Sequence, residues 1–375
     1  VKRTVSIKLD VTQEQAAILK ILQKEFARAC NLLAPLSAGA RCTNRVRLHH
    51  LGYYLVRKEI PAIGSQMACN AVAAVAQAYR SLLSNNPECR KGEALPAIAF
   101  RDTSSVHFDK RTYTIKGDAL SLFTTAGRVF VPMRLGDFQR RYLVDGLSRE
   151  AVLVRRRGRF FFNLVLDLPD SGAKPPTGKI MGVDLGENTI AAVSTGKLFG
   201  GGKLRHDRDK HLALRRRLQR NGSQSARQLL AKVSGREARH VRQINQEVSK
   251  TIVTEAGRNG CDTIALENLT NIRKRIRTGK RLRSRLHRWA WAQLQAFVAY
   301  KAEAAGIRVQ LVNPAYTSRI CSVCGSLGVR VKHRFSCTCG NLAHSDLNAS
   351  RNLARFGVTA VAPTGAVNRP HVETA

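Results

Sequence analysis

The chain of 375 residues carries 63 Lys and Arg against 26 Asp and Glu, a formal net charge of +37 at pH 7. This length exceeds one ordinary domain and predicts two or three domains, with cores that need no disulfides. The charge indicates a polyanionic partner, and nucleic acid is favoured over a membrane surface because the sequence has no long uncharged apolar run.

The first ten residues predict a β-strand, because apolar Val5, Ile7 and Leu9 alternate with polar residues. They lack the apolar core of a signal peptide, and we therefore expect a cytoplasmic protein.

A helical domain is predicted over residues 11–94. Thr12 and Gln15 have the spacing of a capping box, and two segments with apolar residues at helical spacing follow. Between these segments, the basic stretch from 41 to 50 is interpreted as irregular.

An antiparallel sheet or barrel is predicted over residues 95–170, where apolar residues recur with a period of two. We expect the strand of residues 1–10 to join it, so that the helical domain is an insertion between strands. The segment PDSGAKPPTG at 169–178 is rich in proline and glycine and predicts a linker to the next domain.

After the linker, strands alternate with helices, which predicts an α/β fold. The expected strands are residues 179–184, 189–193, 263–266 and 308–312. A long basic helical region precedes the third strand, a helix from about 285 to 305 precedes the fourth, and a short helix covers 347–354. Residues 358–375 are expected to form a disordered tail.

Three acidic residues are candidates for catalysis. Asp184 and Glu267 each end an apolar strand, and in α/β folds the carboxyl ends of parallel strands are where sites form. Asp346 starts the last helix, where an aspartate is commonly only an N-cap, just as an acidic residue at a strand end is commonly only solvated. If the three meet, they could bind two Mg²⁺ ions and support attack on a phosphodiester.

Four of the nine cysteines form two pairs, Cys321 with Cys324 and Cys337 with Cys339, separated by twelve residues. A glycine follows each pair and permits a tight turn around a metal. This spacing predicts a structural, tetrahedral Zn²⁺ site and not a redox pair. The second pair is one residue shorter than the usual C-x-x-C.

A very basic segment, NIRKRIRTGKRLRSRLHR at 271–288, follows Glu267 closely. A solvated charge run is the ordinary interpretation, but its position favours contact with nucleic-acid phosphates. The tryptophans that follow, Trp289 and Trp291, are expected to pack, although one could stack on a base. The residues predicted to bind nucleic acid are Arg273, Lys274, Arg275, Arg277, Lys280, Arg281, Arg283 and Arg285.

Four segments resemble those of one known family. They are GVDLGE at 182–187, ALENL at 265–269, TSRICSVCG at 317–325 and CGNLAHSDLNASRNLA at 339–354. In this order and spacing they resemble the catalytic segments and zinc ribbon of the RuvC-like nuclease of the TnpB family. His344 stands where the family often has an acidic residue, and the short second cysteine pair is the other departure.

The resemblance implies a wedge-type β-barrel of residues 1–10 and 95–170 with an inserted helical recognition domain of 11–94. It further implies an RNase H-like (RuvC) nuclease of 171–315 and 344–357 with an inserted zinc ribbon of 316–343. The implied activity is RNA-guided, Mg²⁺-dependent cutting of double-stranded DNA beside a short adjacent motif. The implied catalytic and Mg²⁺ ligands are Asp184, Glu267 and Asp346, with guide RNA and target DNA as partners and a monomer favoured.

Three alternatives stay open. A compact type V CRISPR effector would share the nuclease and differ in its guide. A guided DNA-binding repressor would not cut, although the intact acidic trio argues against it. A strand-joining transposase would need a nucleophile, such as a well-placed Tyr, that nothing in the sequence supplies.

Overall fold

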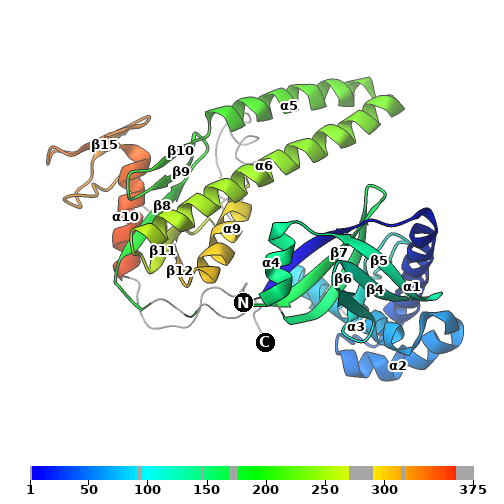
Figure 1. Ribbon diagram of the computed structural model, residues 1–375. Coiled ribbons are helices and arrows are strands. Elements are labelled where there is room, and N and C mark those ends of the chain that lie inside the picture. The colour runs from blue at the N-terminus through cyan, green and yellow to red at the C-terminus, as the bar shows by residue number, and fades with distance from the viewer. Residues whose placement is uncertain are drawn as a thin grey trace. The chain divides into compact units, whose positions relative to one another are not determined.

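The computed structural model describes residues 2–90, 95–145, 147–168, 172, 175–269, 290–313 and 317–359. The chain divides into two compact units, Val1–Asp170 and Ser171–Ala375, coloured from blue to green and from green to red in Figure 1. The eight predicted nucleic-acid-binding residues between 273 and 285, Trp289, and residues 360–375 of the predicted tail lie outside the described ranges.

The first unit is built on a seven-stranded antiparallel sheet with the order β2-β6-β7-β1-β5-β4-β3. As expected, the N-terminal strand joins this sheet: β1 pairs with β7 from Lys2↔Asp167 to Lys8↔Phe161, and with β5 at Lys8↔Arg134. Its apolar residues are buried and alternate with exposed ones. The expected barrel is present as a curled half-barrel with β2 and β3 at its edges. The strands are β1 (Lys2–Leu9), β2 (Val106–Asp109), β3 (Tyr113–Lys116), β4 (Ala119–Thr124), β5 (Gly127–Arg134), β6 (Leu147–Arg156) and β7 (Arg159–Asp167).

Three helices lie between β1 and β2: α1 (Gln13–Gly39), α2 (Arg45–Glu59) and α3 (Ser65–Asn85), with short 3₁₀ turns at Pro61–Ile63 and Pro87–Arg90. The capping box predicted from Thr12 and Gln15 is present at the start of α1. The interpretation of residues 41–50 as irregular was wrong, because α2 begins at Arg45. Asn44 caps this helix by accepting from the N–H groups of Val46 and Arg47, a signal that the basic composition obscured. A further helix, α4 (Asp137–Asp145), was not predicted.

The second unit is an α/β fold, as predicted, around a five-stranded sheet of order β10-β9-β8-β11-β12. The neighbours β8, β11 and β12 are parallel, whereas β9 is antiparallel to both of its neighbours, β8 and β10. The strands are β8 (Ile180–Leu185), β9 (Thr189–Val193), β10 (Leu198–Gly200), β11 (Thr263–Glu267) and β12 (Arg308–Val312).

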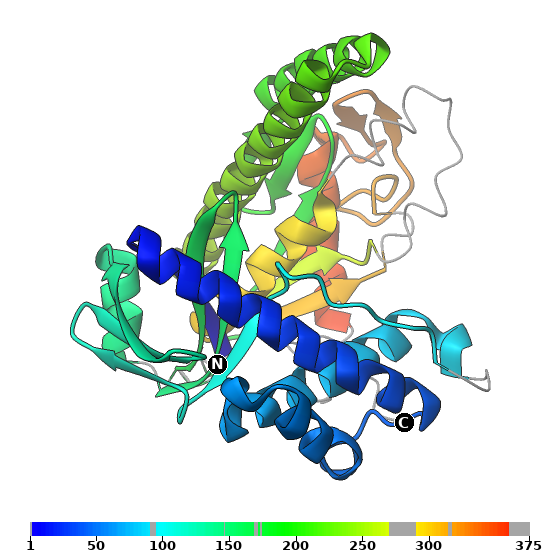
Figure 2. The same cartoon turned by 90° about the vertical axis from the view of Figure 1, so that its right-hand side faces the viewer.

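The long basic helical region consists of two helices, α5 (Gly202–Asn221) and α6 (Gln224–Arg258), which turn at the left-handed Gly222. Figure 2 shows them side by side, and an ion pair between Arg215 and Glu237 links them. The helix expected from 285 begins within the described residues at Trp291, as α9 (Trp291–Ala304). The last helix, α10 (Ser345–Thr359), is longer at both ends than the predicted 347–354.

Helices cover both faces of this sheet, because alternate strand residues contact different helices. Met181 and Val183 of β8 share a core with Val248 of α6 and Leu294 of α9. Ala265 of β11 instead packs with residues of α10. The helices α6 and α9 therefore cover one face of the sheet, and α10 covers the other.

A small three-stranded antiparallel sheet precedes α10 directly. It contains β13 (Val329–Val331), β14 (Arg334–Ser336) and β15 (Leu342–His344). The first cysteine pair precedes β13, and the second pair lies in the loop between β14 and β15. We call residues 317–344 the ribbon.

Candidate functional site

Two carboxylates reach one edge of the sheet of the second unit. The strands β8 and β11 are parallel neighbours paired from Thr263↔Ile180 to Leu266↔Val183, and Asp184 and Glu267 are the next residues along each strand. Because side chains alternate along a strand, both carboxylates fall on the face that α10 covers. The backbone carbonyl of Glu267 is also held by Nε2 of Gln295, at 2.6 Å.

The third carboxylate arrives because α10 packs directly against β8. A Cβ on Gly182 would lie 1.9 Å from the backbone oxygen of Ser350, so only glycine permits this approach. At the other end of α10, a Cβ on Gly357 would lie 3.1 Å from Cγ2 of Ile180. With the helix seated in this way, Asp346 in its first turn faces the ends of β8 and β11 and is only 7 % exposed.

The carboxylates are close enough to perturb one another. Burial, followed by the charge of Glu267 and a hydrogen bond with it, raises the pKa of Asp184 well above its ordinary value, and Asp346 adds to this. Burial also raises the pKa of Glu267, against opposing hydrogen bonds from Asp184 and Thr317. Without a cation, the Asp184–Glu267 pair therefore retains a proton more readily than isolated carboxyls would.

A cation from the ribbon also enters this cluster. Nη2 of Arg330 in β13 lies 3.1 Å from Oδ1 of Asp346, and its charge lowers the pKa of both Asp184 and Glu267. Sequence reasoning missed Arg330 because it is one of many basic residues. Its position in the sequence, between the two cysteine pairs, was the signal that could have identified it. The cluster thus contains three carboxylates and one guanidinium.

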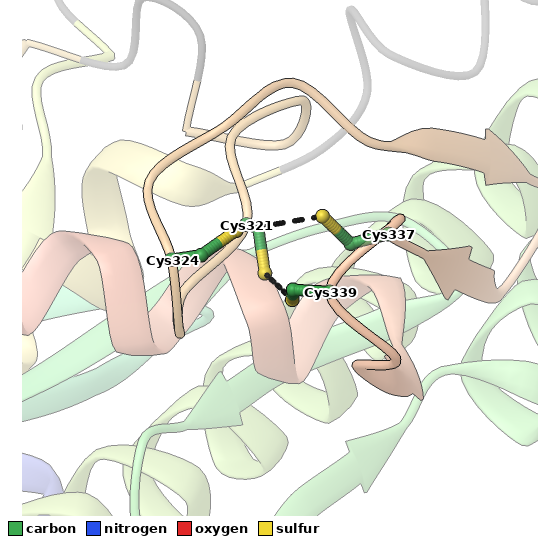
Figure 3. A group of neighbouring side chains, drawn as sticks. All are labelled: Cys321, Cys324, Cys337 and Cys339. Carbon is green, nitrogen blue, oxygen red and sulfur yellow. Dashed lines mark hydrogen bonds between the residues drawn. The ribbon is translucent and has the colours of Figure 1, made fainter.

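The four predicted cysteines form one cluster, with Cys321 and Cys324 on one loop and Cys337 and Cys339 on the other (Figure 3). The sulfurs of Cys321 and Cys339 are 3.7 Å apart, and those of Cys324 and Cys337 are 3.5 Å apart. All four are free thiols. Tetrahedral Zn–S bonds of about 2.3 Å place sulfurs about 3.8 Å apart, so the spacing fits a metal.

Backbone hydrogen bonds lower the pKa of the Cys321 and Cys324 thiols, whereas the neighbouring thiols raise the pKa of Cys339 to about 12 against a backbone hydrogen bond from Asn341. Gly325 and Gly340 both have positive φ, at 81° and 86°, which allows the tight turn after each pair. Burial raises the pKa of the Cys321 thiol, but hydrogen bonds from the Cys324 and Val323 N–H groups and the Asn341 amide lower it to about 6. A thiol with this pKa is ionised at neutral pH, the form that binds a metal.

Two buried asparagines of α10 hold the first cysteine loop. Asn348 accepts from the N–H of Ser322 at 2.9 Å and donates to the carbonyl of Ile320 at 2.7 Å. Asn352, one turn later, donates to the carbonyls of Ile320 and Thr317 at 2.6 and 2.8 Å. The ribbon is thereby fixed to the helix that carries Asp346.

The described tryptophan of the predicted pair packs in the core. Trp291 is 6 % exposed and belongs to the apolar cluster between the sheet and α6.

Two family profiles match the chain, and between them they cover every residue of the site. The profile described as "Probable transposase" matches residues 163–273, which include Asp184 and Glu267. The profile described as "Cas12f1-like, TNB domain" matches residues 291–353, which include Asp346 and the cysteines.

A curated relative carries the family's own name. The "TnpB-like protein" of Methanocaldococcus jannaschii is 29 % identical over 236 residues, 57 % of this chain and 81 % of that protein. Over this region the chain is similar to the TnpB family.

The chain is also similar to Cas12f1 proteins. It is 32 % identical over 234 residues to the "CRISPR-associated endodeoxyribonuclease Cas12f1" of Sulfoacidibacillus thermotolerans, a match over 53 % of this chain and 50 % of that one. The chain thus spans about half the length of that relative. The structure titled "Cryo-EM structure of the Cas12f1-sgRNA-target DNA complex" has the same fold, with a TM-score of 0.66 at 18 % identity over 92 % of this chain and 83 % of that chain.

None of the helices in the described part of the chain has the length and apolar character needed to cross a membrane.

Proposed function

We propose that this chain is an RNA-guided DNA endonuclease that uses Mg²⁺ to hydrolyse phosphodiester bonds in double-stranded DNA. The observation that carries the proposal is the convergence of Asp184, Glu267 and Asp346 at one edge of a parallel sheet. Three half-buried or buried carboxylates repel one another strongly, and a polynuclear cation site is the simplest reason to retain them together.

The donor set fits Mg²⁺, a hard cation that prefers carboxylate oxygens. Asp184 and Glu267 share a hydrogen bond, and Arg330 already supplies a positive charge to Asp346. Two Mg²⁺ ions bound to these three side chains would activate a water molecule and stabilise the leaving oxygen.

The chain's own residues have separate roles in this mechanism. Asp184 and Glu267 would hold the ions as ionised carboxylates, so the pair would have to give up its shared proton on ligation. Arg330, at 3.1 Å from Asp346, neutralises that carboxylate and adds a positive charge to the carboxylate cluster. Gln295 and Thr317 position Glu267 through its carbonyl and its carboxylate.

The four-cysteine cluster is proposed to bind one structural Zn²⁺. Its sulfur distances fit, and all four ligand positions are filled by protein, which leaves no open position for substrate. Within the second unit, we propose a RuvC-like nuclease domain of residues 171–315 and 344–357 that holds the zinc ribbon of 316–343.

Guide RNA and target DNA are the proposed partners. The net charge of +37 favours a polyanionic partner. The relative is named for DNA cleavage, and the solved neighbour for a complex with guide RNA and target DNA. The predicted phosphate-binding residues between 273 and 285 directly follow β11 in the sequence. Both partners would be met in a bacterial or archaeal cytoplasm.

A transposon-borne enzyme is preferred to a CRISPR effector, because the "Probable transposase" profile matches the part of the chain that holds Asp184 and Glu267. A repressor without cleavage has no need of the three carboxylates, whose mutual repulsion costs stability.

The deciding experiment is to purify the chain from cells that carry its native locus and to sequence any bound RNA. DNA matching that RNA is then incubated with Mg²⁺ and either the native protein or the Asp184→Asn variant. The proposal is supported if the native protein cuts the matching DNA and the variant does not, while the variant still binds RNA and target. Guided binding with no cutting by the native protein would support a repressor, and absence of a discrete RNA would support a transposase.

A further inference from the structure

Two ribbon histidines lie beside Asp346 and have no part in the proposed cleavage. His333 is in the turn between β13 and β14, and His344 ends β15. Their ring centroids are 5.4 Å apart and the ring planes differ by 20°. One ring nitrogen from each and one carboxylate oxygen of Asp346 all lie within 4.8 Å of one another.

The backbone fixes this arrangement before any ligand binds. His344 pairs with Arg334 across β15 and β14, next to the turn that holds His333. The N–H of Ser345, the first residue of α10, donates to the carbonyl of His333 at 2.9 Å. The hydroxyl of Ser345 donates to the carbonyl of Lys332 at 3.3 Å. The turn with one histidine is therefore tied to the segment that carries the other histidine and Asp346.

The two oxygens of Asp346 face different partners. Oδ1 accepts from Arg330 at 3.1 Å, and the Ser345 hydroxyl oxygen lies 3.2 Å from it. Oδ2 lies 4.0 Å from Nδ1 of His344. Ligands about 2.1 Å from a tetrahedral metal are about 3.4 Å apart, so this pair must close by about 0.6 Å to share an ion. Nδ1 of His344 also accepts from the backbone N–H of Asp346 at 3.3 Å, and an ion bound at Nδ1 would replace that hydrogen bond.

Two imidazoles and one carboxylate are the ligand set of borderline transition metals and not of Mg²⁺, which prefers oxygen. We propose that His333, His344 and Asp346 form a second metal site that binds a transition-metal dication such as Zn²⁺ or Co²⁺. Lys332 and Arg334 flank the site and repel a cation, so binding is weaker than at a four-cysteine site. The exposed position of His333 gives the ion a route from solvent.

An ion at this site would inhibit the nuclease, because Asp346 would be shared between it and the Mg²⁺ cluster. This consequence rests on the proposed function, whereas the binding of the ion does not.

The test is a titration of the full chain with Co²⁺ in excess Mg²⁺, after elemental analysis has shown one Zn²⁺ per chain. One further equivalent of Co²⁺ is expected, with the visible absorption of nitrogen and oxygen ligation and without a thiolate charge-transfer band. His333→Ala and His344→Ala should each weaken binding at least about tenfold, as loss of a metal's supporting groups commonly does. His50→Ala, which removes an exposed histidine of the first unit, is the matched control and should leave binding unchanged.

Either absence of a further Co²⁺ equivalent or equal affinity in the wild type and His333→Ala would overturn the proposal. A thiolate band would mean that Co²⁺ enters the cysteine cluster, which also overturns it. His333 is on an exposed turn, so its variant tests the site even if His344→Ala folds poorly.

A cleavage assay at fixed Mg²⁺ with added Zn²⁺ then tests the consequence. The wild type should be inhibited, and His333→Ala should need at least about tenfold more Zn²⁺ for the same inhibition. Co²⁺ binding by a chain that does not cut DNA would leave the metal site standing and refute only the proposed function.

Discussion

Nη2 of Arg330, on the ribbon, lies 3.1 Å from Oδ1 of Asp346, in the first turn of α10. The pair connects the ribbon to the carboxylate cluster, because Arg330 also lowers the pKa of Asp184 and Glu267. The charge balance of the site therefore depends on where the ribbon holds one guanidinium. Structural zinc, by shaping the ribbon, would act on the site through this contact.

Replacing Arg330 with Gln should destabilise the protein in the absence of Mg²⁺ by about 1–3 kcal/mol, because Asp346 then loses its charged partner. Mg²⁺ should replace the missing charge, so the rise in Tm on adding Mg²⁺ should be larger in Arg330→Gln than in the wild type. Thermal unfolding with and without Mg²⁺ measures this. Arg330→Lys, which keeps the charge, is the control. An equal rise in Tm with Mg²⁺ in all three proteins would show that Arg330 does not balance the charge of Asp346.

Replacing Asp184 with Asn should abolish cleavage and yet stabilise the metal-free protein. Burial and the charge of Glu267 raise the pKa of Asp184 in the folded state. Between the ordinary value of 3.8 and that raised value the folded chain binds more protons than the unfolded chain, so stability falls as pH rises through this window. Asp184→Asn removes this dependence.

Urea unfolding with a chelator at pH 8 should therefore give a gain of roughly 1 kcal/mol for Asp184→Asn, the size of an ordinary single substitution. Near pH 4 the gain should vanish. A variant that is less stable than the wild type at pH 8 would show that the carboxylates do not repel one another.

Much of the second unit follows from its sequence because the signals are local. Asp184 and Glu267 end apolar runs, and parallel pairing alone brings strand ends to one edge. The cysteine spacing likewise predicts a cluster without knowledge of the rest of the chain.

Asp346 could not be joined to this edge by local signals, since its position depends on how closely α10 approaches β8. That approach rests on Gly182, and a glycine in a strand has several ordinary explanations. Arg330 is hidden for a different reason: in a chain with 63 Lys and Arg, no basic residue is conspicuous. The helix α2 was missed because its cap, Asn44, stands inside a run of basic residues.

Replacing Gly182 with Ala should separate α10 from β8. The new Cβ would meet the backbone oxygen of Ser350 at 1.9 Å, which only a shift of the helix can relieve. We expect a loss of about 1–3 kcal/mol and a strong loss of cleavage, because Asp346 moves with the helix. Gly202→Ala is the control, since a Cβ there meets nothing within 4 Å. Full cleavage activity in Gly182→Ala would show that the close contact between α10 and β8 does not position Asp346.

Replacing Asn352 with Ala should loosen the first cysteine loop. The fully buried side-chain amide donates to the carbonyls of Thr317 and Ile320. Both hydrogen bonds would be lost, although the Ile320 carbonyl keeps the one from Asn348. A cost of about 1–3 kcal/mol is expected for the lost hydrogen bonds, together with faster Zn²⁺ loss to a chromogenic chelator. The Asn259→Ala variant, which changes an exposed asparagine, is the control and should release Zn²⁺ at the wild-type rate. The same rate in Asn352→Ala would show that Asn352 does not hold the first cysteine loop.

Asp262 should make the second unit sensitive to acid. Its side chain is 2 % exposed and accepts from the N–H groups of Thr177 and Gly178, the hydroxyl of Thr263 and the guanidinium of Arg308. Burial raises its pKa, but these hydrogen bonds together lower it below the ordinary 3.8. A lowered folded pKa contributes stability that is present above 3.8 and lost as pH falls through the folded value.

Asp262→Asn should therefore cost about 1–3 kcal/mol at pH 7, and the difference from the wild type should shrink as the pH falls below 3.8. Tryptophan fluorescence measures the second unit alone, because both tryptophans, Trp289 and Trp291, belong to it. Asp209→Asn, on the exposed side of α5, is the control. A cost for Asp262→Asn that stays constant down to the acid transition would mean that shape, and not charge, accounts for its contribution.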